Sequence, residues 1–248
     1  MTRLLSYLVT LIFPVFLLLL RASAAGTASD TLSSSSNITD GETLVSSGST
    51  FTLGFFSPTG VPAKRYLGIW FTASPDAVCW VANRDSHLNS TSGVLVVGST
   101  GSLRILDGSG HAAWSSNTTT SSSAPAVVQL LDSGNLVVRE QSSGDVLWQS
   151  FDHPSNTLLA GMRIGKDLQT GAEWSLTSWR ASNDPTTGKC RRVMNTMGLP
   201  DIVSWQGNAK KYRAGPWNGL FFSSAPEMAR QSNSDPYSNQ VVVPPRVE

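Results

Sequence analysis

The sequence is poor in charge and has no long helical pattern. Charged residues make up 14% of its 248 positions, against about 25% in an average globular domain. The formal net charge of +1 argues against the strongly basic surface of a nucleic-acid-binding domain. No heptads and no amphipathic helical period run through the chain, which argues against a helical bundle. Serine, threonine and glycine are abundant instead, as is typical of a β-rich protein with many short turns.

Cysteine and histidine are scarce enough to limit the chemistry of the chain. The two cysteines, Cys79 and Cys190, allow one disulfide at most, and Cys79 lies in an apolar run where a buried free thiol is an equal alternative. The three histidines show no metal-ligand spacing, so we expect no metal and no other cofactor. Neither paired glycosidase carboxylates nor a nucleophile elbow is evident, and we expect no enzyme.

One sequence pattern occurs twice between Leu95 and Phe151. A run over residues 100–106 leads through a turn to Trp114, and a run over residues 133–139 leads through another turn to Trp148. The two tryptophans are 34 residues apart. The apolar residues come in short β-branched runs broken by glycine, serine and aspartate, which indicates hairpins rather than helical repeats. The unit is therefore a small sheet that ends on a tryptophan.

One such sheet cannot bury its apolar face alone, so we expect a third copy to complete a shared core. Upstream, Phe51–Phe56 and Tyr66–Phe71 have strand patterns, and Trp70 lies near the end of the second run. Residues 25–40 are predicted to enter as one short edge strand. The predicted fold is all-β, with three quasi-repeated antiparallel sheets around a tryptophan-rich core.

The first 24 residues are predicted to be a signal peptide. Arg3 precedes an apolar run over residues 4–20, and the small-residue pattern that follows, Ala22-Ser23-Ala24, suits cleavage after Ala24. A membrane anchor is the alternative, but Pro14 interrupts the run. Cleavage would leave a secreted mature chain without a membrane span. Three acceptor sequons, at Asn37, Asn89 and Asn117, agree with secretion and predict N-glycosylation there.

The second half of the chain is predicted to form a separate β-rich region. Pro154 marks the exit from the repeats, so we place a boundary near residue 150, with domains over residues 25–150 and 151–248. Basic residues gather in the second region, where they form either a binding face for an acidic peptide or glycan or, more simply, a solvated strand face. These basic residues are Lys189, Arg191, Arg192, Lys210, Lys211 and Arg213.

A series of motifs along the mature chain resembles the ectodomain of plant S-domain (G-type lectin) receptor-like kinases and S-locus glycoproteins. The resemblance implies a bulb-type lectin β-prism over residues 25–150 and a partial S-locus glycoprotein-like domain over residues 151–248. It also implies a chain that stops before the membrane span and kinase of those receptors. The matching motifs are Phe51–Pro58, Tyr66–Phe71, Trp80–Asp85, Leu131–Val138, Trp148–Pro154, Ser178–Arg180, Gly198–Pro200 and Arg213–Gly219.

Bulb-type lectins that bind mannose, which the first domain resembles, carry the pattern Gln-x-Asp-x-Asn-x-Val-x-Tyr. The polar groups of this pattern bind sugar hydroxyls. The second copy keeps only Asn135 and Val137 of this pattern, and the aligned positions in 98–106 and 46–54 keep none. Asn135 and Val137 are thus the candidate carbohydrate-binding residues. The alternative for Asn135 is a tight hairpin turn with Gly134. Arg84 and Asp85 are interpreted as a structural corner.

Two functions follow from the resemblance. The first is a secreted, extracellular recognition module with a lectin fold that binds mannose-type glycans weakly or not at all. The second is a protein-interaction fragment that binds a peptide ligand or pairs with a full-length receptor as a soluble decoy, in a setting such as pollen recognition. A third interpretation, an incomplete gene product, follows from the end of the chain at Glu248.

Overall fold

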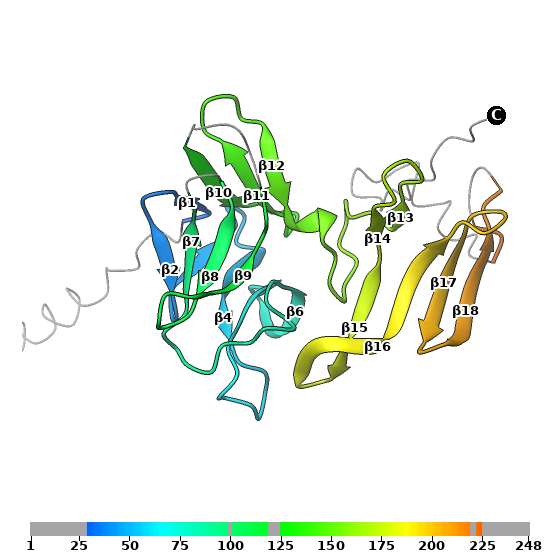
Figure 1. The fold of residues 1–248 in the computed structure, drawn as a ribbon, viewed down its shortest axis with the longest axis horizontal. Coiled ribbons are helices and arrows are strands. Elements are labelled where there is room, and N and C mark those ends of the chain that lie inside the picture. The colour runs from blue at the N-terminus through cyan, green and yellow to red at the C-terminus, as the bar shows by residue number, and fades with distance from the viewer. Residues whose placement is uncertain (1–28, 99–100, 119–124, 219–221, 225–248) are drawn as a thin grey trace, which may run out of the picture.

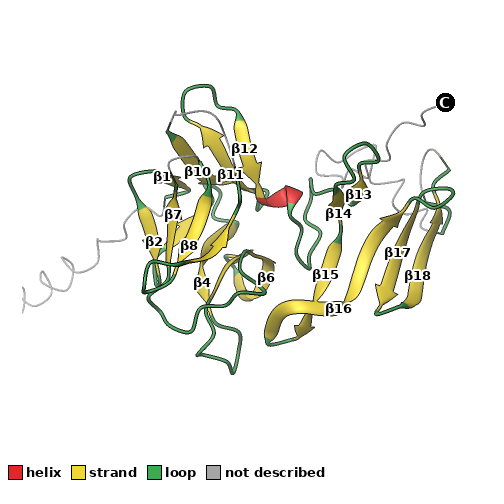
Figure 2. Cartoon of the chain, in the orientation of Figure 1, coloured by secondary structure: helices red, strands yellow, loops and turns green. Residues whose placement is uncertain are grey.

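The computed structural model describes residues 29–98, 101–118, 125–218 and 222–224 (Figure 1). Strands dominate this part of the chain, and a short 3₁₀ turn, η1 (Ser150–Asp152), is the helical element seen in Figure 2. The predicted all-β fold is therefore confirmed. The predicted signal peptide and the C-terminal valine run at 241–243 lie outside the described residues.

The strands up to η1 form three antiparallel sheets of four strands each, which surround a common core as a prism. Sheet A has the order β1-β10-β11-β12, sheet B has β2-β7-β8-β9, and sheet C has β3-β4-β5-β6. The bounds are β1 Thr31–Ser33, β2 Asn37–Thr39, β3 Thr43–Val45, β4 Phe51–Phe56, β5 Tyr66–Phe71, β6 Ser74–Val81, β7 Val94–Val97, β8 Leu103–Leu106, β9 Ala112–Ser115, β10 Ala126–Leu130, β11 Leu136–Glu140 and β12 Val146–Gln149.

The N-terminal segment gives one strand to each sheet, where the sequence predicted a single edge strand. Strands β1, β2 and β3 pair with β10, β7 and β4 respectively. Each has one apolar residue at its centre, and these residues, Leu32, Ile38 and Leu44, are 3–4% exposed. Their spacing of six residues is visible in the sequence, but a three-residue strand is too short to show alternation.

Three tryptophans, one per sheet, meet in the core of the prism. The ring centroids of Trp80, Trp114 and Trp148 lie 6.1–6.3 Å from one another, each pair edge to face. Such geometry suits aromatic quadrupoles and adds about 0.5–1.5 kcal/mol per pair beyond burial. The predicted tryptophan core is present, but its third member is Trp80 on β6 and not Trp70 on β5. The bulge-containing β5–β6 pairing places Trp80 opposite Ile69.

A serine two residues after the tryptophan explains the repeated Trp-x-Ser pattern. The Oγ atom of Ser116 accepts a hydrogen bond from the backbone N–H of Leu103 at 3.0 Å, and Ser150 does the same for Leu136 at 2.9 Å. In sheet C the side chain of Asn83 takes this role toward Leu67, at 2.8 Å. These contacts make β5, β8 and β11 the equivalent strands of the three copies.

After η1, the chain forms a small hairpin and a second four-stranded sheet, which we call the second module. The sheet has the order β15-β16-β17-β18 and its own small core of Met194, Ile202, Ala214 and Phe222, with Trp217 packed against it. The bounds are β13 Gly165–Lys166, β14 Glu173–Trp174, β15 Leu176–Ala181, β16 Asp184–Asn195, β17 Asp201–Gln206 and β18 Ala209–Pro216.

Both cysteines are free thiols, so the alternative of a disulfide between them is not realised. Cys79 is 2% exposed and its thiol donates to the carbonyl of Ile69 at 3.2 Å. Burial raises the pKa of the Cys79 thiol to about 12. Cys190 lies exposed on β16 of the second module.

Candidate functional site

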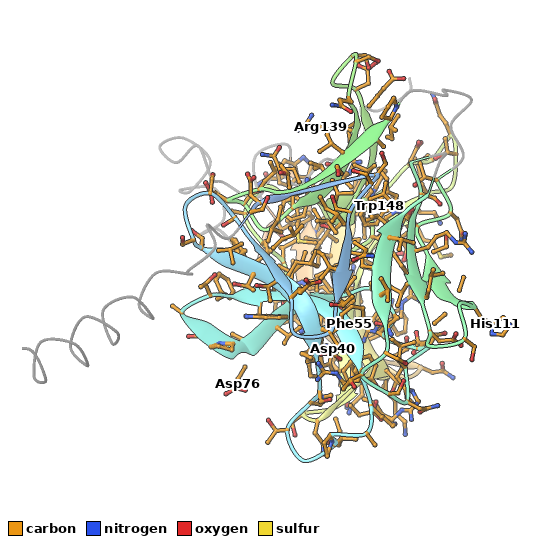
Figure 3. All side chains as sticks on the ribbon, turned by 90° about the vertical axis from the view of Figure 1, so that its left-hand side faces the viewer. Asp40, Phe55, Asp76, His111, Arg139 and Trp148 are labelled. Carbon is orange, nitrogen blue, oxygen red and sulfur yellow. The ribbon has the colours of Figure 1, made fainter. Side chains whose placement is uncertain are left out.

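On the outward side of each prism sheet, one central-strand residue corresponds to the valine of the lectin pattern. We call this residue and its two cross-strand neighbours a row. On sheet A, Val137 lies opposite Gln129 and Gln149 on the neighbouring strands; we call this the Val137 row. Figure 3 shows the three-sided arrangement, with Arg139 of sheet A, His111 in the β8–β9 turn of sheet B and Asp76 of sheet C far apart at its periphery.

The other two rows follow from the same equivalence of strands. On sheet B, Arg104 lies between Val96 and Ser115 and forms the Arg104 row. On sheet C, Gly68 lies between Gly54 and Val81 and forms the Gly68 row. The sequence pattern assigns the third copy to residues 46–54, which end on β4, whereas the strand of sheet C equivalent to β8 and β11 is β5. The assignment is one strand too early because the turn before β4 resembles the turns before β8 and β11.

The Val137 row has one hydrogen-bonded amide side chain on each side of the valine. Gln129 Nε2 donates to Asp30 Oδ2 at 2.9 Å. On the other side of Val137, Gln149 Nε2 donates to Asp152 Oδ2 at 2.9 Å. Both glutamines are half-buried, whereas Val137 is only 1% exposed between them. Amides and a carboxylate around a valine are the residue types that a lectin uses toward sugar hydroxyls.

Asn135 lies at the end of this row and has structural partners on every side. Its Nδ2 donates to Gln149 Oε1 at 2.9 Å, and its Oδ1 accepts from Ser150 Oγ at 3.1 Å and from the backbone N–H of Phe151 at 3.2 Å. The side chain therefore ties β11 to β12 and η1. Sugar binding by Asn135 and Val137 remains a prediction. The contacts above support the alternative, a structural role of Asn135 in the hairpin.

Asp132 lies one residue before the position of the aspartate in the lectin pattern, and its side chain also has a structural contact. It accepts from the backbone N–H of Gly48 at 2.6 Å and from Ser47 Oγ at 3.0 Å. The Gly48 hydrogen bond is the main reason that the pKa of Asp132 lies below its usual value. Asp132 thus joins the turn of sheet A to the turn of sheet C.

The Arg104 row is open and lies among the predicted glycosylation sites. Arg104 is exposed on β8. Asn37 lies on β2 of the same sheet, Asn117 follows β9, and Asn89 lies in the loop between β6 and β7; all three are exposed. Exposure is what an attached glycan requires, and the three modifications remain predictions.

The Gly68 row is covered by aromatic side chains. A Cβ atom added at Gly68 would lie 2.6 Å from Cε1 of Phe56, so the phenyl ring rests directly on this glycine. Phe56 stacks in turn on Trp179 of β15, with 6.4 Å between ring centroids. The second module thus packs over the face of sheet C, and the row is closed to a sugar.

Arg84 and Asp85, interpreted from sequence as a structural corner, hold the second module in place. The Arg84 guanidinium donates to the carbonyls of Pro185, Thr177 and Ser178 at 2.7–3.2 Å. Burial lowers the pKa of Arg84, and the charge of Asp85 opposes that shift. Asp85 accepts from the backbone N–H and hydroxyl of Thr187 at 2.8 and 2.7 Å.

The basic cluster predicted in the second module is divided between different environments. Lys189, Arg191 and Trp205 line a hollow of about 270 Å³, and Lys210 Nζ lies 5.1 Å from the Trp205 ring centroid. Arg191 pairs with Glu173 at 2.7 Å. Arg192 lies over Tyr212 instead, at 5.8 Å, and Arg213 pairs with buried Asp201 at 2.6 Å.

Sequence reasoning missed Gln129 and Gln149 because it followed one strand at a time. The lectin pattern lists alternate residues of a single strand, whereas these glutamines reach the Val137 row from β10 and β12. The hairpin register would have found them, since residues opposite each other across a turn share one face. Among the described residues, no cluster of histidine, cysteine, aspartate and glutamate is arranged to hold a metal ion.

Comparison with known proteins finds a similarity to lectins over part of this chain. Residues 77–180 match the family model described as D-mannose binding lectin. Two solved structures to which this chain is similar are a monomeric mannose-binding lectin from Gastrodia elata (21% identity, TM-score 0.38, 49% of this chain and 94% of that one) and the mannose-specific agglutinin from snowdrop, Galanthus nivalis (22% identity, TM-score 0.35, 44% of this chain and 87% of that one).

Curated relatives match over most of this chain. The receptor-like serine/threonine-protein kinase SD1-8 of Arabidopsis thaliana is 42% identical over 218 residues, which are 85% of this chain and 25% of the relative. The S-locus-specific glycoprotein S6 of Brassica oleracea is 42% identical over 222 residues, 88% of this chain and 50% of the relative. The chain thus spans a quarter to a half of the length of these relatives. Within the described ranges, no helix has the length and hydropathy needed to cross a membrane.

Proposed function

Because this chain is a homologue of the S-locus glycoproteins and the G-type lectin S-receptor-like kinases, we propose that it is an extracellular recognition module whose lectin prism binds glycans weakly. The proposed activity is binding and not catalysis. The lectin fold and the S-locus glycoprotein relatives support a non-enzymatic module. A mannose-type glycan is the proposed ligand class, since the matching family is named for D-mannose binding.

The observation that carries the proposal is the pair of hydrogen-bonded amides, Gln129 and Gln149, on either side of Val137 in sheet A. Among the three rows, only the Val137 row combines amide side chains with a valine. Gln129 and Gln149 are half-buried and each uses one of its two amide protons internally, so the second amide proton of each remains for a sugar hydroxyl. Because Val137 is covered, a sugar would contact the amides more than the valine, and we expect weak binding.

Binding of the secreted mature chain to a mannose-type glycan array tests this function, with Gln149→Ala as the variant. Loss of one hydrogen-bonding partner removes about 0.5–1.5 kcal/mol, so we expect binding to fall about three- to tenfold. Arg104→Ala is the matched control, because Arg104 is the exposed central residue of the equivalent row on sheet B. An array that gives no signal with the folded wild-type protein would refute glycan binding.

A second candidate function, the binding of an acidic peptide, is supported by a basic hollow on the second module. The hollow lined by Lys189, Arg191 and Trp205 combines cations with an indole on the second module, a chemistry that suits an acidic peptide. Binding of a poly-glutamate peptide that disappears in Lys189→Glu, with the glycan signal unchanged, would support this alternative. Pairing with a full-length receptor is not favoured by any contact described above.

A further inference from the structure

A cavity lies where the tryptophan end of the prism meets the second module. Its volume is about 420 Å³, within the range of about 300–1,000 Å³ for small-molecule sites. Trp80, Trp114 and Trp148 line it from the prism, and Ser175 and Thr177 line it from the second module. The Arg84 contacts to the second module described above fix the distance between its walls. The cavity includes Val81 of the Gly68 row and Ser115 of the Arg104 row in its lining, but no residue of the Val137 row.

The lining of this cavity suits a sugar ring. Indole surfaces pack on sugar carbons, and serine and threonine hydroxyls bind sugar hydroxyls. Trp148 is 8% exposed, and its indole N–H has no acceptor among the residues that the structure describes. His153 stacks on the same indole, with 5.4 Å between ring centroids.

The rim of the cavity holds a glycosylation acceptor. Asn117 lines the cavity, is exposed and is the asparagine of an Asn-Thr-Thr sequon. Its backbone has a left-handed φ of +52°, and its N–H donates to Ser115 Oγ at 3.1 Å. This contact fixes the residue at the mouth of the cavity, next to Trp114. The other two sequon asparagines do not line it.

We propose that the first N-acetylglucosamine of a glycan on Asn117 occupies this cavity and joins the prism to the second module. In the attachment reaction, Asn117 Nδ2 forms a bond to the anomeric carbon of a lipid-diphosphate oligosaccharide. The amide loses one proton and the lipid diphosphate leaves. The occupant is a part of the protein's own glycan, already tethered at the rim, so a low intrinsic affinity is sufficient.

The proposal gives the glycan a structural role that the other two sequons lack. A sugar between the indoles of the prism and the hydroxyls of the second module adds contacts to both walls. These contacts supplement the bonds of Arg84 and Asp85 across the same junction. Loss of the Asn117 glycan should therefore loosen the second module, whereas loss of the glycan at Asn37 or Asn89 should not.

Site-resolved deglycosylation of the native secreted protein tests the proposal. We expect a peptide amidase that removes N-glycans to act at least tenfold more slowly at Asn117 than at Asn37 and Asn89, as followed by mass spectrometry of each site. Ser175→Trp fills the cavity and should remove this protection. Ser142→Trp, in the exposed turn after β11, is the matched control.

A second measurement does not depend on the cavity-filling variant. Asn117→Gln and Thr119→Ala both remove the sequon, and both should increase cleavage between the modules by a protease, while Asn37→Gln and Asn89→Gln should not. Equal deglycosylation rates at the three sites of the wild type would overturn the proposal. An unmodified Asn117 in the folded, secreted protein would overturn it as well.

Discussion

At the scale of single residues, the side chain with the most consequential contacts is Asn135. Its oxygen accepts from Ser150 and Phe151 and its nitrogen donates to Gln149, so one amide holds three groups of η1 and β12. A lectin would use an asparagine at this position toward a ligand. In this protein the asparagine stabilises the fold of the second repeat copy, since it connects β11 to β12 and η1.

Asn135→Ala should therefore destabilise the protein whether or not a glycan is present. Removing the amide leaves the buried N–H of Phe151 and the hydroxyl of Ser150 without their acceptor, at about 1–3 kcal/mol for such groups. Urea denaturation followed by tryptophan fluorescence measures the loss. Ser133→Ala, in the same turn but exposed, should cost less than 0.5 kcal/mol by comparison. A stable N135A variant that loses only glycan binding would contradict the structural role.

The two thiols should differ sharply in reactivity. Cys79 is buried and its pKa is raised to about 12, so at pH 8 it is protonated as well as inaccessible. Cys190 is exposed. Native protein treated with iodoacetamide at pH 8 should thus incorporate one label, at Cys190, and two after denaturation in urea. Two labels in the native state would show that β6 opens.

At the scale of elements, the three N-terminal strands are the part of the prism that sequence patterns predicted least well. The repeat between Leu95 and Phe151 predicted the sheet, the number of copies and the tryptophan core, because its strands are long enough to show apolar runs. Strands of three residues show no period. The Val137 row depended on hairpin register, which a one-strand pattern cannot give.

Each N-terminal strand should contribute comparably to stability. Leu32, Ile38 and Leu44 fill equivalent places in the three sheets and are nearly fully buried. Leu or Ile to Ala in a core costs about 2–5 kcal/mol, so each single substitution should lower the free energy of unfolding by that amount. Equilibrium denaturation checks the three variants, with Ser34→Ala as the exposed control. A negligible effect at one position would show that its sheet closes without the strand.

At the scale of the whole molecule, the prism and the second module form one unit through the Arg84–Asp85 corner and the Phe56–Trp179 stack. The corner supplies charge-assisted bonds, and the stack covers the Gly68 row. One of three lectin faces has been converted into an interface. The Phe56–Trp179 stack covers the Gly68 row and leaves the Arg104 row of sheet B exposed.

Arg84→Ala should separate the second module from the prism without unfolding the prism. The substitution removes bonds to three carbonyls of β15 and β16, each worth about 1.5–3 kcal/mol when the donor is charged. Limited proteolysis should then cut the residues 155–175 at least tenfold faster. Arg104→Ala, on the exposed row of sheet B, is the matched control. Unchanged proteolysis would mean that the aromatic stack alone holds the module.

The nested pairing of the N-terminal strands sets the order in which the chain can fold as it leaves the ribosome. Strand β3 finds its partner first in β4, β2 must wait for β7, and β1 must wait for β10. During synthesis, sheet C is complete once residue 81 has emerged, sheet B at residue 115 and sheet A at residue 149. Strand β1, the first of the described prism strands to be made, is therefore the last of them to be paired, and a nascent chain stalled before β10 keeps Leu32 available to chaperones.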